Sequence, residues 1–335
     1  RKIFSLDENP QSAMVYIGSF GYHELYVNGE KITENVLNPV SSYMPKRIPY
    51  LTYDISDKLT KGNNVIAVWH AAGWARWRRL KEYTNPPFVF KAQANIQLSE
   101  EELIQATDES WKCKKSHSEY YGDWDILDFG GETIDERLRE DDWNQADYDD
   151  SNWANAVVYT QHEPEAANSQ QDFKYAVPED IRVADKKFIQ NSSSITAELS
   201  PQMVEPQVKY ELVTPESVTK NEDGTYLIDM GQNYTGFFEI NLYHGTEGDS
   251  VLFEISDQIE KRIMWAQKSK YIFDKTGEGQ FANRFNVAGG RWITVTGLNY
   301  PPKLSDIKGY VITNDRKRTS KFECSNPLLN QIDFP

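Results

Sequence analysis

The sequence predicts an all-β protein: two antiparallel, jelly-roll-like β-sandwich domains joined by a linker, with the start of a helix at the C-terminus. Apolar runs of about five to eight residues recur along both halves, and Gly, Asn or Asp turns separate them. Nothing between these runs is long enough for the crossover helices of a parallel sheet. Aromatic residues, which suit the cores of β-sheets, make up 13% of the chain.

A change in composition divides the sequence into domains. The segment EAANSQQDFKYAVPED is polar and rich in Gln, Asn and Ser, which is typical of a linker. We therefore expect a first sandwich at 1–165, a linker at 166–180 and a second sandwich at 181–321. Residues 322–335 form the helical start.

Local patterns support individual elements of the first half. The stretch HELYVNGEKI is a hairpin candidate because Asn28-Gly29 tolerates the positive φ angles of a type I′ turn. Ser56 is placed to cap a short turn that Gly62 ends. Strands are expected at 65–69 and 88–98, and long acidic loops at 118–153.

In the second half, strands are expected in TYLIDM, FFEINLYH, SVLFEIS, KYIFDK, RWITVTGL and GYVIT. Near the C-terminus, Asn326 followed by Pro327 is a helix-start pattern, with a side-chain acceptor before a ring that suits the first helical position. Leu328, Leu329 and Ile332 then fall on one helix face.

Charge and cysteine content exclude several classes of function. The chain has 36 Lys+Arg and 51 Asp+Glu, and its net charge of −15 argues against nucleic acid or anionic membranes as partners. No apolar run approaches the ~18 residues of a membrane span. Cys113 and Cys324 lie far apart and predict neither a disulfide framework nor a zinc site.

Two stretches are candidates for ligand binding. The acidic segment 132–150 includes Glu132 and Asp135 and could hold Ca²⁺, although it lacks EF-hand spacing and also fits a solvated acidic loop. The segment GWARWRRLKEY places Trp74, Arg76 and Trp77 together. Such residues could bind a polyhydroxylated ligand, or pack on their own or a neighbouring domain.

Motifs for catalysis are missing from the sequence. There is no GxSxG, HExxH, phosphate-loop or GxGxxG pattern, and the five histidines show no ligand or triad spacing. No pair of carboxylates can be singled out for glycoside hydrolysis among 51 acidic residues. The residues alone therefore indicate a non-catalytic β protein, with carbohydrate binding as a candidate function.

Several stretches resemble the N-terminal part of bacterial α-L-rhamnosidases. They occur in the family's order: GYHELYVNGEKI, NVLNPVSSYMPKRIPYLTYDISDKLTKGNNVIAVWHAAGW, ATDESWKC, GGETIDERL, DYDDSNW, YLIDMGQNYTGFFEINLYHGTEGDSVLFEIS and GYVITNDRKRTSKFECSNPLLNQI. In that family, sequence similar to FECSNPLLNQI leads into an (α/α) catalytic barrel. The resemblance implies that residues 322–335 begin such a barrel and that the rest of it is absent from this sequence.

This resemblance implies an inverting glycoside hydrolase that removes terminal α-L-rhamnose, with one acidic residue protonating the leaving oxygen and another activating water. Both belong to the barrel, so we expect no catalytic residue here. Some members bind L-rhamnose with Ca²⁺ through loops near a Gly-Trp turn. Here Ala71 and Ala72 precede that turn where relatives often carry a polar residue. Glu34, Asn35 and Tyr43 complete the carbohydrate-binding candidates.

Three hypotheses follow from the residues and the resemblance. The chain is the scaffold and cleft wall of a rhamnosidase, an independent carbohydrate-binding protein, or a structural or adhesive β protein. The first expects a rhamnose-containing glycan and the catalytic barrel of the same polypeptide as partners, and an exposed apolar patch where the barrel docks. It requires no cofactor, with Ca²⁺ as the one candidate. A periplasmic or extracellular location is favoured over a cytoplasmic one.

Overall fold

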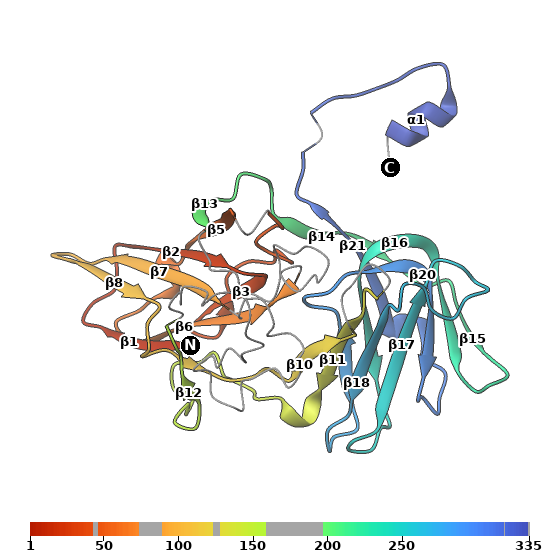
Figure 1. Cartoon of the computed structure of the whole chain (residues 1–335), viewed down its shortest axis with the longest axis horizontal. Helices are drawn as coiled ribbons and strands as arrows, with labels where there is room; N and C mark the ends of the chain where they lie inside the picture. Colours follow the sequence, from red (N-terminus) through yellow and green to blue (C-terminus); the bar gives the residue numbers. More distant parts are fainter. Residues whose placement is uncertain (43–45, 74–88, 123–127, 159–196, 318, 334–335) are drawn as a thin grey trace, which may run out of the picture.

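A computed structural model of the chain describes residues 1–42, 46–73, 89–122, 128–158, 197–317 and 319–333. The expected linker at 166–180 lies outside these residues. The fold is all-β, as predicted, and its strands form two bodies that lie side by side (Figure 1). No helix in the described ranges is long and apolar enough to cross a membrane.

The first body is a β-sandwich of two sheets (Figure 1). One sheet has the order β1-β6-β3-β4, and the other has the order β13-β5-β2-β7-β8. Their strands are β1 (Lys2–Leu6), β2 (Ser12–Ser19), β3 (Tyr22–Val27), β4 (Glu30–Lys31), β5 (Arg47–Asp54), β6 (Gly62–Ala71), β7 (Phe90–Gln97), β8 (Glu102–Ala106) and β13 (Glu198–Pro201). A 3-10 turn, η1 (Ser56–Lys58), joins β5 to β6, and a small sheet pairs β9 (Lys112–Cys113) with β12 (Ala154–Asn155).

Alternation along the strands builds the core of this sandwich. In β2, Ala13, Val15 and Ile17 are each at most 1% exposed and face the same way, because successive side chains of a strand point to opposite sides. From the facing sheet, Leu25 and Val27 enter the same apolar cluster. The two sheets are therefore held together by interleaved aliphatic side chains.

The second body is built from one ten-stranded sheet with the main order β10-β11-β18-β17-β20-β16-β21-β14; β15 and β19 also pair with β16. Its strands are β10 (Ser118–Tyr121), β11 (Gly131–Asp135), β14 (Gln207–Val213), β15 (Ser217–Lys220), β16 (Tyr226–Leu242), β17 (Ser250–Ser256), β18 (Lys268–Ile272), β19 (Gly279–Ala282), β20 (Ala288–Thr296) and β21 (Ile307–Asn314). The 3-10 turns η4 (Glu136–Leu138) and η6 (Leu304–Asp306) follow β11 and precede β21.

Strand β16 pairs with four other strands of this sheet. Its first half pairs with β15 and β20, and its second half pairs with β21 and β19. Between Asp229 and Tyr234 its register against β20 shifts. Ile228 before the shift, Met230 within it, and Phe238 and Ile240 after it enter one core. The sheet thus curls around its own apolar face.

The predicted hairpin and C-terminal helix are confirmed. Asn28 (φ 49°) and Gly29 (φ 89°) both have positive φ between β3 and β4. Helix α1 (Pro327–Asp333) begins after Asn326, whose Oδ1 accepts a hydrogen bond from the backbone N–H of Leu328 at 3.0 Å. These elements depend on local chemistry, which the sequence shows directly.

Two local expectations are wrong. Ser56 does not cap the turn through its side chain; instead its Oγ accepts a hydrogen bond from the backbone N–H of Ala13 at 2.9 Å. The acidic segment 118–153, expected to form loops, contributes β10 and β11 to the second body. Strand β11 pairs in parallel with β18, and this long-range pairing left no local pattern in the sequence.

Strand exchange links the two bodies across the expected domain boundary. Strands β10 and β11 precede residue 165 but belong to the sheet of the second body, whereas β13 follows residue 181 and pairs in parallel with β5 of the first. Each body therefore contains at least one strand from the other side of the expected linker.

Candidate functional site

The predicted carbohydrate-binding residues fall into two groups. Tyr43, Trp74, Arg76 and Trp77 lie outside the described residues, so these four stay predictions. Glu34 is exposed and Asn35 half-buried in the segment after β4.

A backbone hydrogen bond holds that segment at the residue after Asn35. The backbone N–H of Val36 donates to the carbonyl of Gln207 at 2.9 Å, which ties the segment to β14 of the second body.

The two candidate calcium ligands already have protein donors. Glu132 in β11 is 2% exposed, and its carboxylate accepts hydrogen bonds from the backbone N–H groups of Arg284 (3.1 Å) and Phe285 (2.6 Å). The carboxylate of Asp135 pairs with the guanidinium of Arg137 at 2.7 Å. Among the residues that the structure describes, no three His, Cys, Asp or Glu side chains gather as a metal site.

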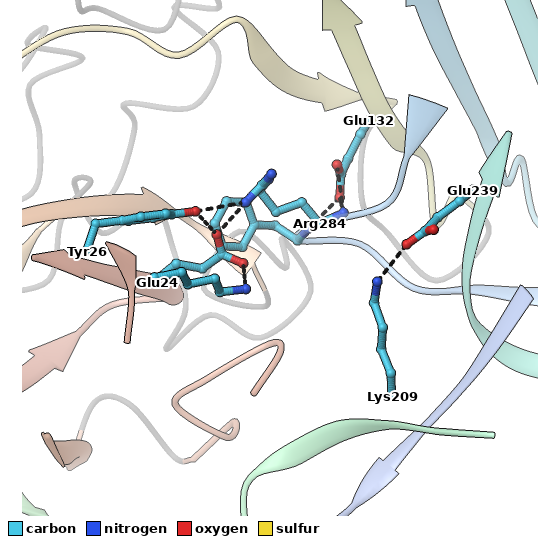
Figure 2. Close-up of polar contacts among 8 residues, drawn as sticks. Glu24, Tyr26, Glu132, Lys209, Glu239 and Arg284 are labelled. Atoms are coloured by element: carbon cyan, nitrogen blue, oxygen red, sulfur yellow. Dashed lines mark hydrogen bonds and ion pairs between the residues drawn. The ribbon is translucent and has the colours of Figure 1, made fainter. Parts of the chain in front are cut away.

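The most elaborate polar arrangement of the described chain lies where the two bodies meet. We name it the joint cluster: Glu24, Tyr26, Lys31, Trp69 and Arg284. Figure 2 shows Glu24 and Tyr26 of β3 facing Arg284, which lies between β19 and β20.

The pleat of β3 explains this placement. Leu25 and Val27 enter the core of the first body, so Glu24 and Tyr26 project from the opposite face of the strand. That face is the one turned toward the second body (Figure 2).

Glu24 is the centre of the hydrogen bonds. Arg284 Nη1 donates to Glu24 Oε2 and to the hydroxyl of Tyr26, the latter at 3.1 Å. Lys31 Nζ donates to Glu24 Oε1 at 2.7 Å, and the Tyr26 hydroxyl donates to Glu24 Oε2 at 2.7 Å. The Glu24 side chain is only 6% exposed, so these donors replace its lost hydration.

The charges in the cluster are mutually stabilised. Burial alone would raise the pKa of Glu24, but Arg284 and Lys31 outweigh it and hold that pKa below its ordinary value. Burial and the neighbouring Glu24 carboxylate raise the pKa of Tyr26, so its hydroxyl stays a donor. Burial would lower the pKa of Arg284, but Glu24, Tyr26 and Glu132 together outweigh burial and raise that pKa.

Arg284 is also held by aromatic rings. Its Cζ lies 4.1 Å from the centroid of Trp69, within the range of a cation–π contact. Trp69 contacts the rings of Trp143 at 5.9 Å, His117 at 5.4 Å and Phe285 at 6.2 Å. Burial, together with Arg139 and Arg284, lowers the pKa of His117 to about 4, so this ring is neutral at pH 7.

Glu132 completes the polar contacts around Arg284 from within the second body, as Figure 2 shows. Burial raises the pKa of Glu132 to about 7, although backbone donors at Arg284 and Phe285 oppose that change. Glu132 thus fixes the backbone from which the Arg284 side chain reaches Glu24. An apolar cluster of Tyr22, Val36, Leu37, Phe237 and Phe285 lies beside these groups.

The geometry of the joint cluster fits a structural role, since an ion pair to a buried carboxylate and a cation–π contact join one body to the other. Sequence reasoning missed the cluster because Arg284 is far from β3 in the chain. One pattern could have indicated half of the cluster: Glu24 lies in a strand, YHELYV, with several large apolar or aromatic residues, and a buried carboxylate needs a cation.

Comparison with known proteins identifies the family of the chain. Residues 8–175 match the family model described as the α-L-rhamnosidase N-terminal domain. The chain belongs to the bacterial α-L-rhamnosidase family. Residues 219–313 of this family member match a second model, the bacterial α-L-rhamnosidase concanavalin-like domain. The resemblance inferred from the sequence is confirmed.

Curated and solved relatives agree with this assignment. An α-L-rhamnosidase of Formosa agariphila is 26% identical over 99% of this chain and 33% of its own length. One of Alteromonas sp. is 25% identical, over 99% of this chain and 34% of its own length. The structure of the Dictyoglumus thermophilum α-L-rhamnosidase matches with a TM-score of 0.79 and 26% identity, covering 99% of this chain and 34% of that one. This chain therefore spans about a third of the length of these rhamnosidases.

Proposed function

We propose that this chain is the non-catalytic β-sandwich part of an α-L-rhamnosidase that removes terminal α-L-rhamnose from glycans. The observation that supports this most directly is the match of two rhamnosidase domains in order, within relatives about three times as long as the chain. In this proposal the two bodies act as a rigid scaffold and wall for a helical catalytic barrel, in a periplasmic or extracellular enzyme.

The joint cluster supports the scaffold role. A wall of a substrate cleft must keep its shape, because catalytic groups act only within a narrow range of positions. The ion pair, the cation–π contact and the exchanged strands join the two bodies directly to each other.

Hydrolysis of an aryl α-L-rhamnoside tests the proposal. One protein to test is the longer polypeptide encoded by the same reading frame, and the other is residues 1–335. We expect the longer polypeptide to hydrolyse the rhamnoside and residues 1–335 not to do so. An aryl β-D-glucoside is the control substrate, to be left intact by both. Turnover of the rhamnoside by residues 1–335, or by neither polypeptide, would contradict it.

We also propose that residues around Trp74, Arg76 and Trp77, with Glu34, Asn35 and Tyr43, contact the sugar. Rings beside guanidinium groups suit a polyhydroxylated ligand. Titration calorimetry with L-rhamnose should show binding that Trp74→Ala and Trp77→Ala weaken. Trp265→Ala is the matched control, since Trp265 is 45% exposed in the second body. Repeating the titration with EDTA tests a role for Ca²⁺.

A further inference from the structure

Four apolar side chains are exposed along the segment that leads from the first body into the second. Met203 is 78% exposed, Val204 51%, Tyr210 69% and Leu212 53%. The first two lie in the connection from β13 to β14, and the other two lie in β14, a terminal strand of the large sheet. We name these four residues the exit patch.

Hydrogen bonds hold the backbone that carries Met203 and Val204 of the exit patch. The N–H of Gln202 donates to the carbonyl of Tyr50 at 3.0 Å, and the Gln202 side chain donates to the carbonyl of Val204 at 3.1 Å. In the second body, Asn314 Nδ2 donates to the carbonyl of Glu205 at 2.8 Å. A connection held to both bodies in this way presents Met203 and Val204 in a defined position.

Strand β14 fixes the other half of the patch. Its register against β21 is interrupted between Lys209 and Glu211, so Tyr210 is the extra residue of a bulge. Lys209 itself pairs with Glu239 at 2.6 Å. Charged residues thus border exposed apolar ones, an arrangement typical of protein–protein contact surfaces.

The position of the patch indicates what covers it. Asp315, the first residue after β21, donates its N–H to the carbonyl of Pro206 at 2.8 Å, close to Val204 in sequence. Figure 1 shows the chain leaving β21 next to β14 and rising away from both bodies to α1. This departing segment also exposes apolar residues: Phe322 is 48% exposed, Leu328 62% and Leu329 46%.

We propose that the exit patch is the docking surface for the helical polypeptide that follows α1 in the full-length α-L-rhamnosidase. The inference rests on the proposed function, because relatives carry about two-thirds of their length outside the matched part. Packing that polypeptide at the point where the chain leaves the sheet would bury the patch and the apolar residues of the departing segment together.

Hydroxyl-radical footprinting tests the docking surface. Residues 1–335 and the longer polypeptide of the same reading frame are oxidised in parallel and analysed by mass spectrometry. We expect oxidation of Met203 and Tyr210 to fall several-fold in the longer polypeptide. Trp265, 45% exposed and distant in the chain, should react equally in both, and Met230, 1% exposed, should be protected in both.

Equal oxidation of Met203 in both polypeptides would overturn the proposal. So would a reading frame that stops after residue 335. Protection in residues 1–335 that grows with protein concentration would overturn it in favour of a second copy of the chain as the occupant.

A variant series provides a second measurement. Met203→Ser combined with Tyr210→Ser should lower the Tm of the longer polypeptide and leave that of residues 1–335 unchanged. Ile259→Ser, at a residue 59% exposed elsewhere on the second body, should change neither. Rhamnoside hydrolysis is measured separately: a protected patch without turnover would refute the proposed function alone, and turnover with an unprotected patch would refute the docking surface alone.

Discussion

At the scale of single residues, Arg284 provides the main charged contact between the two bodies. Its side chain is 35% exposed, whereas that of its partner Glu24 is 6% exposed. Removing the cation would leave a buried carboxylate with Lys31 and Tyr26 as its remaining donors. Losing one of its two cations destabilises a carboxylate that is nearly buried, because little water can reach it to replace the lost interaction.

We therefore expect Arg284→Met to lower the free energy of unfolding by about 2 kcal/mol, less than for a fully buried pair because Arg284 is partly exposed. Urea denaturation measures the change. Lys209→Met is the matched control: its pair with Glu239 joins strands of the same body and is more exposed, so it should cost less than about 1 kcal/mol. Equal losses in the two variants would show that Arg284 has no special role.

The raised pKa of Glu132 predicts how the free energy of unfolding changes with pH. Its pKa in the folded protein is about 7, above its ordinary value of 4.5, so the folded state binds more protons than the unfolded state between these values. The contribution of Glu132 to the free energy of unfolding therefore falls as pH rises from 4.5 to 7, by about 3 kcal/mol in total, and is constant above that range.

Glu132→Gln should remove this dependence, so the variant gains stability relative to the parent as pH rises. Urea denaturation at several pH values between about 4.5 and 8 measures the difference. Glu222→Gln, at an exposed acidic residue, is the control and should follow the parent. A constant difference between Glu132→Gln and the parent would refute the assignment.

At the scale of elements, the curled sheet depends on close approach of β16 and β21. A Cβ on Gly236 of β16 would lie 1.8 Å from the carbonyl oxygen of Tyr310 in β21, closer than any real contact. We expect Gly236→Ala to lower the free energy of unfolding by about 3 kcal/mol or more, since the backbone must move. Thermal unfolding followed by circular dichroism provides the measurement.

Gly289→Ala is the matched control for that variant. A Cβ there would meet the Thr235 hydroxyl oxygen at 3.3 Å, which a small side-chain movement relieves. The control should lose clearly less stability than Gly236→Ala. If both variants unfold at the same temperature, close approach at Gly236 is not what shapes the sheet.

The elements divide into those that the sequence predicts and those that it does not. The Asn28-Gly29 hairpin, the helix after Asn326 and most strands depend on neighbouring residues, so their patterns are visible locally. The pairing of β11 with β18 and the contact of Glu24 with Arg284 join distant residues, and nothing in either local stretch specifies its partner. The candidate sugar-binding residues around Trp74 remain predictions.

At the scale of the whole molecule, strand exchange makes the two bodies depend on each other. A fragment ending at residue 165 contains β10 and β11 without β18, and β5 without β13. We expect this fragment to unfold at lower temperature and less cooperatively than residues 1–335. Amide hydrogen exchange should show weak protection in β5 and β11 of the fragment, and equal protection in both proteins would show independent domains.

The same exchange of strands constrains the order of events during synthesis. When β5 leaves the ribosome, its neighbour β13 is still more than a hundred residues from being made. The partner of β11, β18, follows it in the chain by a similar distance. Until those residues emerge, each strand presents unpaired backbone groups that can associate with other nascent chains. We expect chaperone binding to persist until about residue 272 has left the ribosome, the point at which both parallel pairs can close.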